Sequence, residues 1–232
     1  MDIGFDVISD LYLEPDDSFN WEGKATSLYC LVAGNVSSNL RTIVQTLAHL
    51  SKLYQGVFYI PGTLEYQDCS DIKSRTEEIL QVCSRISNLA ILHHHVIIID
   101  GIAVLGANGW YDAPDKEDLQ YNATLEIARY EDVSYLKKSI QKLQKHLDVK
   151  KILLLTSSVP NDKLYFGEVP DSTTHSIPLS IALGADTESK ITHWAFGTYK
   201  KIVDTSFDGI NYVCNPRKDK SPYWAKRIAV AT

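Results

Sequence analysis

The chain has 232 residues, of which 44% are apolar and 22% charged, ordinary values for a globular protein with its own hydrophobic core. The formal charge of −6 and the lack of a long basic run argue against a broad positive surface, so nucleic acid is not expected as a main partner. No window of about 18 apolar residues predicts a membrane span. The acidic N-terminal stretch is also not typical of a signal peptide.

In the first part of the chain, short apolar runs alternate with amphipathic segments. The runs 2–10, 27–34 and 56–62 end in turn residues, which is typical of buried strands. Ser37 or Ser38 is expected to cap a helix whose apolar face is Leu40, Ile43, Val44, Leu47 and Leu50. A Ser-Asp cap predicts a second helix over 70–86.

The second part of the chain has a different pattern. Asp100-Gly101 and Asp208-Gly209 each predict a tight hairpin between apolar runs. The other expectations, in chain order, are strands within 89–110, a polar surface segment at 111–131, a helix at 132–147, a buried strand at 150–157, an irregular segment at 158–190 with a short helix near 178–184, and strands at 192–216. Parallel units followed by hairpins predict mixed sheets with helices on their outer faces.

We expect one domain over residues 1–232, with a C-terminal tail at about 218–232. The four cysteines lie far apart and form no CxxC pair. They are interpreted as free thiols in a reducing compartment, which predicts a cytoplasmic location. These cysteines are Cys30, Cys69, Cys83 and Cys214.

Five polar turns follow predicted strands, at the positions where α/β sheets gather functional groups. They are Asp10-Leu11-Tyr12, Gly34-Asn35, Gly62-Thr63-Leu64-Glu65, Thr156-Ser157-Ser158 and Gly197-Thr198-Tyr199-Lys200. Their order and spacing resemble the calcineurin-like metallophosphoesterases. The motifs of that family run Asp-x-His, Gly-Asp, Gly-Asn-His-Asp/Glu, a histidine that ends a later strand, and Gly-His-x-His.

The residues around these turns strengthen the resemblance, which covers about residues 3–217. "VISDLYLE", "LVAGN", "LGANGWYD" and "VCNPR" are similar to the family's Ile-Ser-Asp-Leu-His-Leu-Glu, Ala-Gly-Asp, Leu-Gly-Ala-x-x-Trp and Asn-Pro-Arg stretches. The resemblance implies the calcineurin-like phosphoesterase fold of two facing mixed β-sheets flanked by helices, a four-layer α/β/β/α sandwich.

Members of that family hold two divalent ions with carboxylates, imidazoles and an amide oxygen, and use a further histidine in catalysis. This sequence has lost most of those groups. Of seven expected metal ligands only Asp10 is kept, and Leu64 stands at the catalytic histidine position. The full set of vestigial positions is Asp10, Tyr12, Asn35, Thr63, Leu64, Ser157, Thr198 and Lys200.

Each replacement has a chemical consequence. Asn35 has no charge and one acceptor oxygen, so it cannot bridge two cations as an aspartate does. Leu64 cannot transfer a proton, and the Lys200 ammonium would repel a divalent ion. The sequence therefore predicts no catalytic residue, no bound metal and no cofactor. Whether Lys200 pairs with Asp10 in the vacated site stays open at this point.

The triplet His93-His94-His95 also suggests a metal ligand set. It is expected to form part of a strand, where at most His93 and His95 share a face, and to lie away from the five turns. We therefore interpret it as structural, and we interpret His193, near the last motif, in the same way. His175 also lies near a motif region.

The first functional hypothesis is a pseudoenzyme: a catalytically inactive phosphoesterase-like chain that serves as a structural or protein-interaction module. A protein partner or self-assembly is expected, and a viral or phage assembly or accessory role is one form of this hypothesis. A metal-free binder of a nucleotide or phosphate is an alternative, with charge from Lys200, Lys201 and Arg217. Another is a residual phosphoesterase with a shifted metal site, built from Asp112, Asp115, Asp162 or the histidines.

Overall fold

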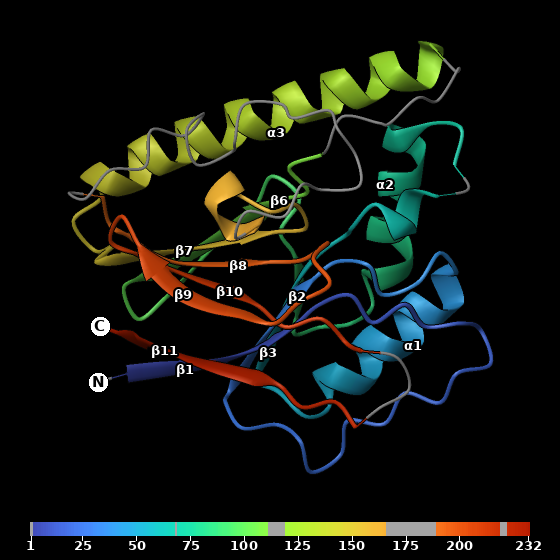
Figure 1. Ribbon diagram of the computed structural model, residues 1–232, viewed down its shortest axis with the longest axis horizontal. Coiled ribbons are helices and arrows are strands. Elements are labelled where there is room, and N and C mark those ends of the chain that lie inside the picture. The colour runs from blue at the N-terminus through green and yellow to red at the C-terminus, as the bar shows by residue number, and fades with distance from the viewer. Residues whose placement is uncertain (1, 68, 111–118, 166–188, 219–221) are drawn as a thin grey trace.

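The computed structural model describes residues 2–67, 69–110, 119–165, 189–218 and 222–232 (Figure 1). Its first sheet has five strands in the order β11-β1-β2-β3-β4. Strands β1 to β4 are parallel, and β11 pairs antiparallel with β1 at one edge. The strands are β1 (Asp2–Ile8), β2 (Tyr29–Ala33), β3 (Gly56–Ile60), β4 (Leu89–Ile91) and β11 (Lys226–Ala231).

The second sheet has six strands in the order β5-β6-β7-β8-β10-β9, with parallel pairing inside and antiparallel strands at both edges. Both predicted hairpins are confirmed, because Ile99 pairs with Ile102 and Phe207 pairs with Ile210. The strands are β5 (Val96–Ile99), β6 (Ile102–Ala107), β7 (Lys151–Thr156), β8 (Ile191–Phe196), β9 (Val203–Phe207) and β10 (Ile210–Cys214).

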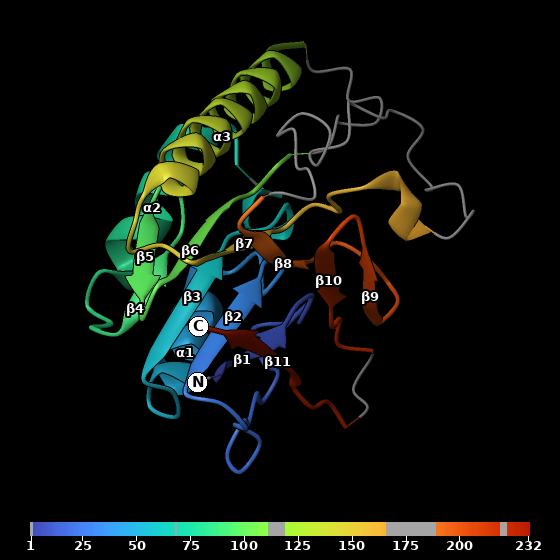
Figure 2. The same cartoon turned by 90° about the vertical axis from the view of Figure 1, so that its left-hand side faces the viewer.

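Helices cover the outer face of each sheet, as Figures 1 and 2 show. Residues of α1 and α2 share one core with the first sheet, and α3 shares another with the second sheet. A third core lies between the sheets and includes Phe5, Leu31 and Leu155. The predicted architecture, two facing mixed sheets flanked by helices, is confirmed. The helices are α1 (Leu40–Ser51), α2 (Ile72–Cys83) and α3 (Leu119–Lys145), with single 3-10 turns at Leu64–Tyr66 and Asp162–Tyr165.

The start of α1 differs from the prediction. Asn39, and not Ser37 or Ser38, caps the helix, since its side chain accepts a hydrogen bond from the Thr42 amide. The Ser37 hydroxyl instead donates to the carbonyl of Leu13, 2.7 Å away. Asp71 caps α2 through the Ser74 amide, which confirms the predicted Ser-Asp start of that helix.

The expected surface segment at 111–131 is wrong from residue 119 onward, because α3 begins at Leu119. The helix contacts two cores: Leu125 belongs to the first, whereas Leu136 and Ile140 belong to the second. The apolar face of α3 therefore packs against the first core near its start and against the second core further along. This change makes the helical period hard to recognise in the sequence. The short helix expected near 178–184 lies outside the described residues.

The expected C-terminal tail is also wrong over its last part. Strand β11 pairs with β1 from Asp2–Ala231 to Val7–Lys226, so the two chain ends lie side by side (Figures 1 and 2). Ile228 and Val230 are buried on the inner face of this edge strand. Two alternating apolar residues beside basic ones are too short a pattern to predict a strand.

All four cysteines are free, as predicted. Among the described residues, no helix has both the length and the apolar character needed to cross a bilayer. The cytoplasmic location stays a prediction.

Candidate functional site

The loops after β1, β2, β3, β7 and β8 meet at one edge of the two sheets. Backbone hydrogen bonds join the first two loops, from the Asp10 amide to the Gly34 carbonyl (3.1 Å) and from the Tyr12 amide to the Asn35 carbonyl (3.0 Å). Gly34 makes the close approach possible, because a Cβ atom there would lie 2.7 Å from the Ser157 hydroxyl and 2.8 Å from the Gly62 backbone. We call this meeting point of the five loops the vestigial cleft, a name that refers only to the resemblance of these positions to the family's ligand motifs.

Asn35 lies at the centre of the vestigial cleft and is 1% exposed. Its Nδ2 donates to Asp10 Oδ1 (2.8 Å) and to the Thr198 hydroxyl (3.1 Å), while its Oδ1 accepts from the Leu64 amide (3.0 Å). The Leu64 N–H can only donate, so it fixes which end of the Asn35 amide faces Asp10. The amide group thus presents hydrogens, not a lone pair, to the remaining carboxylate.

The hydroxyl replacements complete this network. The Thr198 amide donates to Asp10 Oδ1 (2.9 Å), and the Ser157 and Thr198 hydroxyls lie 3.2 Å apart. The Thr63 hydroxyl lies 3.5 Å from Asn35 Oδ1. Five vestigial positions therefore meet as the sequence predicts, and they bind one another.

Three vestigial positions do not join the network through their side chains. The Tyr12 side chain is 53% exposed, Lys200 is exposed, and the partly buried Leu64 contributes only its backbone amide. Asp10 receives its hydrogen bonds from Asn35 and Thr198 rather than from Lys200. The Asp10–Lys200 pair that the sequence left open is therefore not part of the vestigial cleft.

Glu65 holds the β2 and β3 loops together and is fully buried. Its Oε1 accepts from the Val36 amide (2.7 Å) and the Tyr59 hydroxyl (2.8 Å). Its Oε2 accepts from the amides of Gly62 (2.8 Å) and Asn35 (3.1 Å). This carboxylate fixes the shape of the turn through these four internal hydrogen bonds.

Four vestigial positions have a left-handed backbone, namely Asp10, Tyr12, Asn35 and Thr198, with φ between 46° and 54°. Such a conformation costs a residue other than glycine about 1 kcal/mol or more, and it persists only where the surroundings enforce it. The loops of the vestigial cleft are therefore strained turns that their surroundings hold in place.

Burial raises the pKa of Asp10 from 3.8 to about 6, and the hydrogen bond from Asn35 offsets part of the rise. Burial also raises the pKa of Glu65, although its hydrogen bonds favour the charged form. Within the described part of the chain, Asp10 Oδ2 has no hydrogen-bond partner. The vestigial cleft thus offers one carboxyl group with a raised pKa, one amide whose NH₂ group points toward that carboxyl, and three hydroxyl groups. This set of side chains does not fit a pair of divalent ions.

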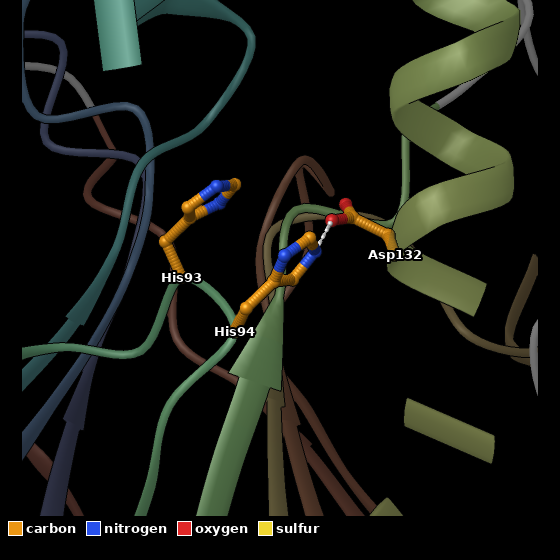
Figure 3. Close-up of side chains that lie close together, drawn as sticks. All are labelled: His93, His94 and Asp132. Carbon is orange, nitrogen blue, oxygen red and sulfur yellow. Dashed lines mark hydrogen bonds and ion pairs between the residues drawn. The ribbon is translucent and has the colours of Figure 1, made fainter. Parts of the chain in front are cut away.

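A second polar cluster lies beside the vestigial cleft and consists of His93, His94 and Asp132 (Figure 3). One ligand atom from each residue lies within 4.8 Å of the other two. His94 Nε2 is 2.9 Å from Asp132 Oδ1, and Asp132 Oδ2 accepts from the Gly109 amide (3.0 Å). We call this group the histidine cluster.

The sequence-based interpretation of the histidine triplet is partly wrong. These histidines lie in the connection between β4 and β5, not inside a strand, and His94 takes a left-handed turn with φ 54°. The turn stacks the rings of His93 and His94, with centroids 4.4 Å apart and an interplanar angle of 16°. Neighbouring side chains in an extended strand would point to opposite faces.

The histidine cluster is also closer to the motif loops than expected. His93 pairs with Gly106 at the end of β6, and two residues later the Asn108 side chain donates to the Pro61 carbonyl (2.7 Å). Asp132 was missed because it lies 38 residues from His94. The available signal was a carboxylate on the apolar face of a helix, four residues before the buried Leu136.

Among the described residues, the other acids and histidines that the sequence suggested as ligands do not join these sites. His193 lies in β8 with Nδ1 3.0 Å from the Thr192 hydroxyl, and burial lowers its pKa. Asp162 starts an exposed 3-10 turn. Asp112, Asp115 and His175 lie outside the described residues.

No family model matches the sequence. The chain is 22% identical over 119 residues to "Uncharacterized protein L509" of Acanthamoeba polyphaga mimivirus. The match covers 44% of this chain and 42% of that protein, so this chain spans less than half the length of the relative.

Two solved structures resemble the whole chain. Phosphopantetheinyl hydrolase from Mycobacterium tuberculosis gives a TM-score of 0.67 at 14% identity, over 98% of this chain and 96% of its own. A putative 5'-nucleotidase from Staphylococcus aureus gives 0.58 at 12% identity, over 100% of this chain and 51% of its own. Both have the calcineurin-like phosphoesterase fold, and at these identities the likeness concerns the fold alone. The chain therefore has the calcineurin-like phosphoesterase fold.

Proposed function

We propose that this chain is a pseudoenzyme: a calcineurin-like phosphoesterase fold that does not hydrolyse phosphoesters and serves as a structural or protein-interaction module. The two fold neighbours are named as a hydrolase and a nucleotidase, so the fold itself is suited to phosphoester chemistry. Fold does not determine function, and the argument depends on the groups at the vestigial cleft.

The observation that carries this proposal is the position of Asn35. Its Nδ2 lies 2.8 Å from Asp10 Oδ1, so a neutral donor occupies the space next to the one remaining acid. Two-metal hydrolysis needs anionic ligands that hold both ions and activate a water. A cation entering here would have to displace the Asn35–Asp10 and Asn35–Thr198 hydrogen bonds and would gain a single carboxylate.

The interaction role is supported by apolar side chains that remain exposed on α3. Ile127 is 59% exposed and Tyr130 is 75% exposed, and their i, i+3 spacing places them together on one helix face. Exposed aromatic and aliphatic residues at adjacent positions are typical anchors of protein interfaces. The similarity of part of the chain to a mimivirus protein agrees with a role in a viral assembly.

The test is a hydrolysis assay on metal-depleted protein reloaded with Mn²⁺, with bis(p-nitrophenyl) phosphate as substrate. We expect no turnover above that of the Asp10→Asn variant, because the vestigial cleft lacks the ligands for two ions. Turnover that disappears in both Asp10→Asn and Asn35→Ala would overturn the proposal. Light scattering of the wild type and of a variant with Ile127→Ser and Tyr130→Ser tests self-assembly in parallel.

A metal-free phosphate or nucleotide binder is a second candidate, favoured by a hollow of about 310 Å³ below the β1 loop. Lys24 and Arg217 supply positive charge there for a phosphate group. Trp21 and Tyr223 also line the hollow, but they are 0% and 9% exposed and offer a base little surface for stacking. The Lys24 ammonium lies 5.3 Å from the centroid of the Trp21 ring. Lys200 and Lys201, which the sequence also suggested, do not line this hollow.

Thermal unfolding with added ATP, GMP or inorganic phosphate distinguishes the two candidates. A nucleotide binder should be stabilised in a concentration-dependent way, and Lys24→Gln should remove the effect. Unchanged unfolding temperatures with all three compounds would eliminate this second candidate and leave the interaction module.

A further inference from the structure

The histidine cluster has the donor set of a transition-metal site. Two imidazole nitrogens and one carboxylate oxygen converge from two separate elements, the β4–β5 connection and α3 (Figure 3). This set suits Zn²⁺ or Fe²⁺ and is poorly suited to Mg²⁺ or Ca²⁺, which prefer sites made of oxygen alone. The three ligand atoms lie within 4.8 Å of one another. The ligand atoms around a tetrahedral zinc ion lie about 3.3 Å from one another. Side-chain movements that bring these atoms roughly 1 to 1.5 Å closer together would therefore be enough.

The charges in the histidine cluster call for a cation. Asp132 is 1% exposed, and a cation beside a buried carboxylate offsets part of the cost of removing its charge from water. In the described part of the chain its ion-pair partner is His94, which is a cation only when protonated. A divalent ion would balance the charge of Asp132 while both imidazoles stayed neutral, the form in which they bind metals.

His93 is the residue that a purely structural interpretation does not explain. A His94–Asp132 hydrogen bond alone would join α3 to the loop without a second ring. His93 is nevertheless stacked on His94, and one of its ring nitrogens lies within 4.8 Å of a carboxylate oxygen of Asp132. Both rings therefore bring a nitrogen to the same carboxylate, as the imidazoles that share a metal ion do.

Solvent access is compatible with an exchangeable ligand. The His94 side chain is 31% exposed, whereas that of Asp132 is 2% exposed. One side of the histidine cluster is therefore anchored in the protein and the other faces water. Three protein ligands with an open fourth position is the usual arrangement of zinc sites that keep a bound water.

We propose that His93, His94 and Asp132 bind one divalent transition-metal ion, Zn²⁺ in the first instance, with water as the fourth ligand. The ion would fasten α3 to the β4–β5 connection next to the vestigial cleft. The proposal does not depend on the pseudoenzyme hypothesis, because no residue of the vestigial cleft takes part in it.

The test is Zn²⁺ binding to tag-free protein, measured by competition with a chromophoric chelator and by metal analysis after dialysis. We expect one equivalent of Zn²⁺ per chain, and saturation should raise the unfolding temperature by about 5 °C or more. Co²⁺ in place of Zn²⁺ should give the visible absorption of a tetrahedral site.

Three variants connect the binding to the histidine cluster. His93→Gln leaves the His94–Asp132 hydrogen bond in place, so the fold should persist while Zn²⁺ affinity falls at least about 100-fold. His94→Asn should weaken binding as much, and asparagine tolerates the left-handed backbone at that position. His95→Asn is the matched control: it changes the exposed third histidine and should leave the affinity within a factor of about three.

Each other outcome is informative. No stoichiometric Zn²⁺, or binding that His93→Gln and His95→Asn affect equally, would overturn the proposal. Binding lost in Asp10→Asn but kept in His93→Gln would place the ion in the vestigial cleft. That result would contradict the metal site proposed here and also the loss of ligands on which the pseudoenzyme hypothesis depends.

Discussion

The vestigial cleft and the histidine cluster lie close together at the ends of strands, yet their polar atoms are used differently. In the vestigial cleft, Asn35 and Thr198 turn their donors toward Asp10, and every hydrogen bond closes within the network. In the histidine cluster, His93 and His94 bring ring nitrogens to a buried carboxylate from a different element. The polar atoms of the first region therefore bind one another, whereas those of the second converge on a shared space.

This difference shows that the place of a residue in a loop does not determine whether its side chain can bind a metal ion. The backbone has positive φ angles at Asp10, Asn35 and Thr198, and these turns determine where the three side chains point. What the side chains then do depends on whether they offer lone pairs or hydrogens to the shared space. A test of either region must therefore change whether a side chain donates or accepts hydrogen bonds, without changing the backbone conformation.

The largest expected effect on stability follows from replacing a hydrogen-bond acceptor of Glu65 with a donor. In Glu65→Gln, one of the two oxygens that each accept two hydrogen bonds becomes an NH₂ group facing two donors. We expect the free energy of unfolding to fall by about 3 to 5 kcal/mol, because buried donors lose their acceptor. Urea unfolding followed by circular dichroism measures the loss.

Glu78→Gln is the matched control for this change. Glu78 lies on α2, is 55% exposed, and forms an ion pair with Arg75 within the described part of the chain. Its substitution should cost less than about 0.5 kcal/mol. A Glu65→Gln loss below about 1 kcal/mol would mean that the loops of the vestigial cleft are not held together by this carboxylate.

Asn35→Asp is the next most disruptive change, because it replaces a neutral hydrogen-bond donor with a second carboxylate. The variant loses the donor to Asp10 Oδ1 and places a second carboxylate beside the first, while the bond from the Leu64 amide can remain. We expect a loss of about 2 to 4 kcal/mol at pH 7.5, smaller at pH 5, where the two acids can share a proton. Urea unfolding at both pH values measures this difference.

Asn20→Asp serves as the control, because Asn20 is exposed and its Oδ1 accepts a hydrogen bond from the Glu22 amide. An aspartate oxygen can accept the same bond, so the free energy of unfolding should hardly change. Addition of Mn²⁺ sharpens the comparison between the two regions. If Mn²⁺ restores the stability of Asn35→Asp, the vestigial cleft still accommodates a cation and only its central residue excludes one.

Most of the fold follows from local patterns in the sequence. Buried strands ending in turns, the Asp71 cap and both Asp-Gly hairpins are encoded within a few residues, and the structure has them as predicted. Strand β11 was missed, because only the pairing with β1 at the other end of the chain makes that basic stretch a strand. The start of α3 was missed because its buried face packs against two different cores.

The two sites differ in the same way. The vestigial cleft was predictable because its residues occupy fixed positions after strands, and Asp10, Asn35 and Thr198 meet as expected. The histidine cluster was not, since it needs a left-handed turn at His94 and a helix residue 38 positions away. No local period or spacing encodes either of these.

The smallest expected effect concerns the charge of Asp10. A pKa raised to about 6 means that the folded chain binds this proton more tightly than the unfolded chain, whose value is 3.8. The stabilisation from the proton is complete below pH 3.8 and is lost as the pH rises through 6. Asp10→Asn removes this dependence, so its stability relative to wild type should be about 1.5 kcal/mol more favourable at pH 8 than at pH 5.

Glu65 is present in both the wild type and Asp10→Asn, so its own raised pKa cancels in this comparison. Asp71→Asn provides the contrast, because hydrogen bonds at the helix cap lower the pKa of Asp71 and its carboxyl group stays ionised throughout this interval. Its stability difference from wild type should be the same at pH 5 and pH 8. If the stability difference between Asp10→Asn and wild type were also the same at pH 5 and pH 8, a positive charge would already balance Asp10, as a bound cation would. The vestigial cleft and the histidine cluster would then no longer differ in the way described above.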